Sequence, residues 1–142
     1  MLKNIPKNIS PELLKVLDEM GHGDEIVLSD GNFPSERIND KVVRCDSTGV
    51  TDLLKSILVL FPLDTDYSDE QVFLMEVTPG DTYKPEIWED YKKVLDESKE
   101  NYTIGNIERF KFYERAKEAF AVVHTGETAL YANIILKKGV VK

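Results

Sequence analysis

Short apolar segments typical of buried strands alternate along this chain with segments whose apolar residues follow helical spacing. Such alternation predicts an α/β fold, with helices packed on a central sheet. The last two strand segments are joined by a turn, Thr125-Gly126-Glu127, that is too short for a crossover helix, so we expect a mixed sheet. The predicted fold is a single three-layer α/β domain with a central mixed sheet. Its strands are expected at 24–30, 42–45, 71–77, 104–107, 119–124 and 131–136, and its helices at 11–20, 50–60, 85–98 and 109–118.

The first of these helices carries a start signal and a stop signal. Ser10 is a residue type that caps helix N-termini, and Pro11 suits the first helical position because its missing N–H would have no partner there. Gly21 is predicted to end the helix as a C-terminal glycine in the left-handed conformation.

No linker, repeat or low-complexity stretch interrupts the chain, so we expect one domain over residues 1–142. The longest apolar run, 57–61, is far shorter than the ~20 residues of a membrane-spanning helix. The first residues lack the apolar stretch of a secretory signal, and the single cysteine, Cys45, cannot form an internal disulfide. We therefore predict a cytoplasmic protein without membrane contact, and we interpret Cys45 as a half-buried small apolar side chain rather than a nucleophile.

The charge balance argues against nucleic-acid partners. The chain has 18 Lys and Arg residues against 26 Asp and Glu residues, which gives a net charge of −8. A field of this sign repels phosphate backbones and anionic lipid surfaces unless a local basic patch overrides it. The only basic cluster, Lys137-Lys138 with Lys142, is too small to do so.

His22 is the first candidate for chemistry, because it lies between Gly21 and Gly23 at the junction of a helix and a strand. Flanking glycines let the backbone approach a ligand closely. The helix C-terminus and Asp24 supply negative charge beside the ring, and an imidazole suits proton transfer at neutral pH. The alternative interpretation is a loop histidine that is merely tolerated at a helix end.

Asp30 follows a predicted strand and precedes a Gly-Asn turn, where α/β sheets often present ligands. The same residue could equally form an Asx turn with its own backbone. We expect no metal site, because His22 and His124 are far apart in the chain and no ligand-type spacing occurs. We also find no phosphate-binding glycine loop, and we interpret His124 as structural.

The helix at 109–118 and the strand at 131–136 carry further candidates. Phe110 and Tyr113 lie three positions apart, and we interpret this stripe as core rather than as a ligand platform. Arg109 directly precedes Phe110, and its side chain could either contact a ligand or be a solvated surface charge. Tyr131 and Asn133 are expected on one face of the strand, where a ring and an amide suit a polyol.

Several motifs follow one another from the first helix to the last strand. They are Ile9-Ser10-Pro11-Glu12-Leu13-Leu14, Gly21-His22-Gly23-Asp24-Glu25-Ile26, Ser29-Asp30-Gly31-Asn32-Phe33-Pro34, Arg109-Phe110-Lys111-Phe112-Tyr113-Glu114-Arg115-Ala116, and Thr125-Gly126-Glu127 through Tyr131-Ala132-Asn133-Ile134-Ile135-Leu136-Lys137-Lys138-Gly139. Taken together, in this order, they resemble the family of ribose pyranases and fucose mutarotases, over nearly the whole chain.

This resemblance implies a fold particular to the family, assembly into a toroidal homodecamer, and catalysis without a cofactor or a metal. The motif around Asp30 and the one that begins at Arg109 resemble the fucose mutarotase branch. Ala132 departs from that branch, which often has glycine there, and is more familiar in pyranases. The family's catalytic histidine falls on His22, and its sugar-binding positions fall on Asp30, Arg109, Tyr131 and Asn133.

The implied activity is interconversion of the α and β anomers of L-fucose by acid- and base-assisted ring opening and closure. We expect His22 to transfer the proton and the other four residues to hold the monosaccharide; a part for Asp30 or Tyr113 in proton transfer stays open. Two alternatives remain: a D-ribose pyranase that interconverts pyranose and furanose rings, and a non-catalytic sugar-binding regulator of a transport operon.

Overall fold

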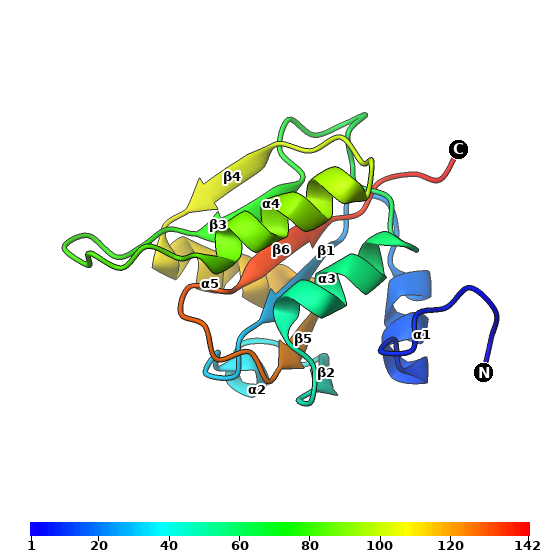
Figure 1. The fold of residues 1–142 in the computed structure, drawn as a ribbon, viewed down its shortest axis with the longest axis horizontal. Coiled ribbons are helices and arrows are strands. Elements are labelled where there is room, and N and C mark those ends of the chain that lie inside the picture. The colour runs from blue at the N-terminus through cyan, green and yellow to red at the C-terminus, as the bar shows by residue number, and fades with distance from the viewer.

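The computed structural model describes residues 1–142 and contains one six-stranded sheet with helices on both faces (Figure 1). The strands are β1 (Glu25–Ser29), β2 (Val42–Cys45), β3 (Val72–Met75), β4 (Ile104–Ile107), β5 (Ala121–Thr125) and β6 (Ile134–Lys137). The helices are α1 (Pro11–Glu19), α2 (Ser35–Ile38), α3 (Val50–Leu58), α4 (Ile87–Glu97) and α5 (Arg109–Glu118). Every predicted strand and helix is present.

The sheet is mixed, as predicted. Its strand order is β2-β5-β1-β6-β3-β4, and β6 runs antiparallel to both of its neighbours while the other neighbouring strands pair in parallel. β5 and β6 run in opposite directions but do not pair, because β1 lies between them. Since β6 alone is reversed, the residues before it lie at the edge of the sheet where all the other strands end.

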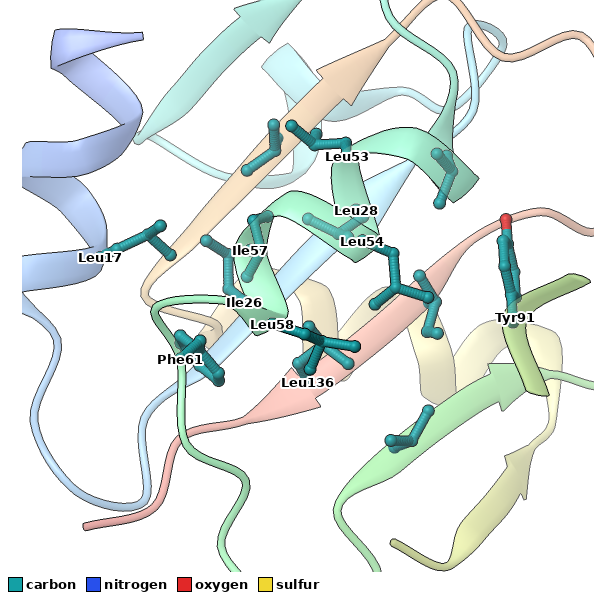
Figure 2. Close-up of a cluster of buried hydrophobic side chains, with 14 of the residues drawn as sticks. Leu17, Ile26, Leu28, Leu53, Leu54, Ile57, Leu58, Phe61, Tyr91 and Leu136 are labelled. Atoms are coloured by element: carbon teal, nitrogen blue, oxygen red, sulfur yellow. The ribbon is translucent and has the colours of Figure 1, made fainter. Parts of the chain in front are cut away.

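Two layers of helices cover the sheet, which confirms the predicted three-layer α/β fold. Helices α1, α3 and α4 pack on one face, where Ile26, Leu28 and Leu54 belong to the larger hydrophobic cluster (Figure 2). Helices α2 and α5 lie on the other face, where Val27 and Phe112 belong to a second cluster. Successive β1 residues therefore enter different layers, as the alternation of side chains along a strand requires.

The predicted start of α1 is confirmed and its predicted stop is wrong. The Ser10 side chain accepts a hydrogen bond from the first turn. The helix ends at Glu19, and Gly21 has no positive φ; the left-handed residue is Gly23, with φ 85°. The ammonium group of Lys138 donates to the carbonyl of Leu17 in the last turn of α1 and to that of Met20, the C-cap residue, so the helix end is satisfied without a glycine cap.

The short helix α2 was not predicted, because four residues are too few to show helical periodicity. Its buried Ser35 contacts His124 of β5, with Oγ 2.8 Å from Nδ1. This buried contact fits the structural role predicted for His124. No helix of the molecule has the length and apolar character needed to cross a membrane.

Candidate functional site

A cavity of about 260 Å³ opens at the edge of the sheet where β1, β3 and β4 end and β6 begins. Asp30 reaches it from the end of β1, Arg109 from the start of α5, and Tyr131 and Asn133 from the loop before β6. The structure thus brings together all four residues predicted to hold a sugar. Convergence of polar side chains from separate elements on one concavity is typical of ligand sites. The cavity is also lined by Asn32, Phe33, Pro34, Met75, Thr78, Asp81, Tyr113 and Leu130.

Asp30 and Asn133 form a reciprocal pair at the base of this cavity. The Asp30 backbone N–H donates to Asn133 Oδ1 at 2.8 Å, and Asn133 Nδ2 donates to Asp30 Oδ2 at 3.2 Å. The other carboxylate oxygen accepts from the Asn32 backbone N–H, so the predicted Asx-turn contact is present as well. Burial raises the pKa of Asp30, and these hydrogen bonds oppose that rise. The Asp30 carboxylate is therefore a rigid, largely desolvated hydrogen-bond acceptor.

Residues 131–133 precede β6, so the prediction that Tyr131 and Asn133 share a strand face is wrong. Tyr131 has φ 57°, a left-handed conformation that a non-glycine residue keeps only where its surroundings hold it. The Trp88 indole N–H donates to the Tyr131 carbonyl at 2.8 Å, and the buried Tyr91 hydroxyl donates to the Ala132 carbonyl at 2.6 Å. Helix α4 therefore fixes the loop that turns both side chains into the cavity.

The Tyr131 hydroxyl is held by the segment that follows β3. It donates to Asp81 Oδ2 at 2.6 Å and accepts from the Thr78 backbone N–H at 3.3 Å, while the Tyr83 ring stacks on the Tyr131 ring. The hydrogen bond from Tyr131 lowers the pKa of Asp81. Sequence reasoning missed Asp81 and Thr78, since no motif marks this segment and its proximity depends on β3 lying beside β6.

Arg109 lies on the outer rim of the cavity, next to Tyr113. Its Nε donates to the Tyr113 hydroxyl at 3.2 Å, and its guanidinium carbon lies 5.5 Å from the ring centres of Phe110 and Tyr113. The prediction that Phe110 and Tyr113 form a core stripe is wrong, because Phe110 is 65% exposed and Tyr113 lines the cavity. Phe112 is the residue of α5 that fills the core.

His22 lies outside this cavity, at the opposite end of β1. Its Nε2 is 3.2 Å from Asp64 Oδ1, and its ring centre is 4.7 Å from that of Tyr67. Asp24 accepts instead from the Gly21 backbone N–H. The five residues of β1 span roughly 15 Å between His22 and the cavity. Within one copy of the chain, His22 therefore cannot reach a ligand held by Asp30.

Cys45 is a free, half-buried thiol that packs against the larger hydrophobic cluster, as predicted. Burial raises the pKa of its thiol, which disfavours the nucleophilic thiolate. The structure contains no group of three or more His, Cys, Asp or Glu side chains arranged to hold a metal ion.

Comparison with known proteins agrees with this fold. Residues 3–141 match the RbsD / FucU transport protein family. The chain belongs to this family. Among RbsD / FucU relatives, it is 49% identical over 147 residues to the fucose mutarotase of Danio rerio, covering 99% of this chain and 95% of the relative. It is 52% identical over 144 residues to an L-fucose mutarotase of Actinobacillus pleuropneumoniae, covering 99% and 97% of the two chains.

Solved structures of the RbsD / FucU family have the same fold. The fucose mutarotase of Streptococcus pneumoniae in complex with L-fucose superposes with a TM-score of 0.95 at 54% identity, covering 99% of this chain and 100% of that one. Bacillus subtilis RbsD complexed with D-ribose covers both chains fully with a TM-score of 0.72 at 23% identity, a likeness that concerns the fold alone.

Proposed function

We infer that this chain is an isomerase that interconverts the α and β anomers of L-fucose. The observation that carries this inference is the convergence of Asp30, Arg109, Tyr131 and Asn133 on one small cavity, in a chain that is about half identical to fucose mutarotases. The cavity volume, about 260 Å³, lies just below the range of ~300–1,000 Å³ typical of drug-sized ligands. That size suits a single monosaccharide.

Each of the four side chains offers a different contact to a sugar. Ionised Asp30 accepts a charge-assisted hydrogen bond from a hydroxyl. Asn133 presents an amide beside it, and the planar guanidinium of Arg109 can donate to two adjacent hydroxyl groups. The Tyr131 hydroxyl already donates to Asp81 and accepts from Thr78, so its remaining lone pair accepts from a sugar hydroxyl.

Anomer exchange requires proton transfers at two oxygens and no redox step. The anomeric O–H loses its proton as the bond from C1 to the ring oxygen breaks, and the ring oxygen gains a proton. Rotation of the resulting aldehyde about the bond between C1 and C2, followed by closure on the other face of the carbonyl, gives the second anomer. His22 is our proposed proton-transfer residue, because a positioned imidazole suits both directions of transfer near neutral pH.

We propose that His22 enters the cavity from a neighbouring copy in a homo-oligomer, a decamer by family resemblance. The separation of His22 from Asp30 along β1 supports this arrangement, since one copy alone presents the two residues at opposite ends of the sheet. We also propose a cytoplasmic location, and the free thiol of Cys45 supports it because that compartment is reducing.

The inferred activity is tested by magnetisation-transfer NMR on wild-type protein. We expect the protein to accelerate exchange between α- and β-L-fucose, with a smaller effect on the pyranose and furanose forms of D-ribose. Faster exchange with ribose than with fucose would identify a pyranase. Binding of either sugar without acceleration of exchange would identify a regulatory binding protein instead.

Assembly and the shared site are tested together. Sedimentation velocity should show a species many times the 16.2 kDa mass of one chain, near ten copies. At fucose concentrations well below KM, co-expressed Asp30→Asn and His22→Ala chains should exchange fucose faster than the mean of the two variants, because mixed assemblies contain some sites with both native residues. A monomer at micromolar concentration, or mixed assemblies that only reach that mean, would contradict the shared site.

Substitutions at the binding residues should affect KM more than kcat. We expect Asp30→Asn and Arg109→Lys to raise KM for L-fucose several-fold with measurable exchange at saturation, since both side chains hold hydroxyl groups in the closed and the opening sugar alike. KM of the wild type should rise as pH falls through the raised pKa of Asp30, above its ordinary 3.8, because the protonated carboxyl is a poorer acceptor. In Asp30→Asn that pH dependence should disappear. Complete loss of turnover in Asp30→Asn would make Asp30 a proton-transfer residue.

A further inference from the structure

Asp81 lies at the bend of the connection between β3 and α4, which projects beyond the end of β3 (Figure 1). The Asp81 backbone N–H donates to the Thr78 carbonyl at 2.9 Å, and Gly80 has φ 91°, a left-handed conformation that glycine adopts without strain. Asp81 Oδ1 accepts from the Tyr83 backbone N–H at 2.9 Å. One carboxylate oxygen of Asp81 is therefore committed to the bend itself.

The other carboxylate oxygen, Oδ2, reaches the loop before β6. It accepts from the Tyr131 hydroxyl at 2.6 Å, although the two residues are 50 positions apart in the chain. This hydrogen bond, together with the one from the Tyr83 N–H, holds the pKa of Asp81 below its ordinary value, so the carboxyl group is ionised at neutral pH. An ionised carboxylate has no proton to donate, so the proton in this hydrogen bond belongs to Tyr131.

The bond to Asp81 decides what the Tyr131 hydroxyl can offer to the cavity. A hydroxyl has one proton and two lone pairs. The proton points at Asp81 and one lone pair accepts from the Thr78 N–H at 3.3 Å, which leaves a single lone pair. The Tyr83 ring stacks on the Tyr131 ring, with the ring centres 5.9 Å apart, and limits its movement. Tyr131 can therefore accept from a ligand, but it cannot donate to one while Asp81 holds its proton.

We propose that Asp81 is a positioning residue that sets the polarity of Tyr131, so that the site selects a sugar with a proton-donating hydroxyl at C2, C3 or C4 opposite Tyr131. The hydroxyl groups at these three carbons keep their protons throughout anomer exchange, whereas the anomeric hydroxyl does not. This inference rests on the proposed function and extends it from the residues that hold the sugar to the chemical group that the sugar must present.

Asp81→Asn should reverse this polarity without disturbing the bend. The Tyr83 N–H requires an oxygen at Oδ1, so the amide oxygen stays there and the new NH₂ group takes the place of Oδ2. That group donates to the Tyr131 oxygen, whose other lone pair already accepts from the Thr78 N–H. The Tyr131 proton is then free to point into the cavity, and the hydroxyl changes from an acceptor to a donor toward the sugar.

Monofluorinated L-fucoses measure this polarity, because a C–F group that replaces a hydroxyl cannot donate a hydrogen bond. We expect the wild type to bind the analogue fluorinated opposite Tyr131 at least ~10-fold more weakly than fucose. In Asp81→Asn, this ratio should shrink by about 3- to 10-fold, the value of one net hydrogen bond, at that one of the three positions. Dissociation constants from NMR titration give these ratios independently of turnover. A variant that merely loosened the cavity would weaken binding of all the sugars alike.

Tyr131→Phe is the second variant, because it removes the hydroxyl on which Asp81 acts. It should lose selectivity against the same fluorinated position, and adding Asp81→Asn should then change the ratio no further. Glu86→Gln is the control: it removes a charge from the same connection at an exposed side chain that caps no helix, and it should leave every ratio unchanged.

Equal ratios in the wild type and Asp81→Asn at all three positions would overturn the proposal. A full effect of Asp81→Asn in the Tyr131→Phe protein would also overturn it, since Asp81 lines the cavity and would then contact the sugar directly. A wild type that binds fucose without accelerating its exchange would refute the proposed function and leave the ratios to decide the role of Asp81. A wild type that binds none of these sugars would overturn both.

Discussion

His22→Ala should slow L-fucose anomer exchange by about 10²–10⁴-fold, the contribution of a positioned acid–base group, and the loss should persist at saturating sugar. Removing the imidazole leaves the four residues proposed to hold the sugar intact, so KM should change little. The side chain is 42% exposed and contributes little to the core, so the variant should remain folded.

Magnetisation-transfer NMR at saturating fucose measures this loss, and circular dichroism checks the fold. Added imidazole should restore part of the exchange rate, because a free ring can enter the space that the side chain leaves. A variant that exchanges anomers at the wild-type rate would remove His22 from the mechanism.

Phe112→Ala should lower the free energy of unfolding by about 3–5 kcal/mol, which is a large part of the ~5–15 kcal/mol available to a domain. Phe112 is fully buried between α5 and the sheet, and its ring meets that of Phe33 edge to face at 6.1 Å. Truncation leaves a void that close-packed neighbours cannot fill. Phe33 and α5 both line the cavity, so sugar binding should weaken as well.

Urea unfolding at a fixed protomer concentration measures the difference. Phe110→Ala is the matched control: the same substitution on the same helix, at a side chain that is 65% exposed. We expect its cost to be within about 0.5 kcal/mol. Equal losses at the two positions would show that α5 is not anchored through Phe112.

Local patterns were sufficient to predict the strands and most of the helices. β1 is an apolar run because both of its faces are covered, and α3 shows its buried stripe directly in the sequence. The sequence does not predict α2, because four residues are too few to show the apolar periodicity of a helix. The placement of β1 between β5 and β6 depends on pairing between distant segments, which no local pattern records.

The candidate site likewise contains residues that local motifs predict and residues that only the tertiary fold brings together. Asp30, Arg109, Tyr131 and Asn133 were found through motifs, and the structure brings them to one cavity. Tyr131 owes its orientation to a left-handed turn held by Trp88, and not to the strand alternation that the sequence predicts. Asp81, the partner of Tyr131, and Asp64, the partner of His22, come from segments without a motif. Only the folded chain places them.

The reversed strand β6 also constrains the order in which the molecule can be assembled. It follows every other strand in the chain, yet it lies between β1 and β3 and joins β2-β5-β1 to β3-β4. During synthesis, those two partial sheets can pair internally while the facing edges of β1 and β3 remain unpaired, and open strand edges invite association with other chains. The closing contacts are long-range, which slows folding. To avoid aggregation, β6 must therefore pair with β1 and β3 soon after it is synthesised.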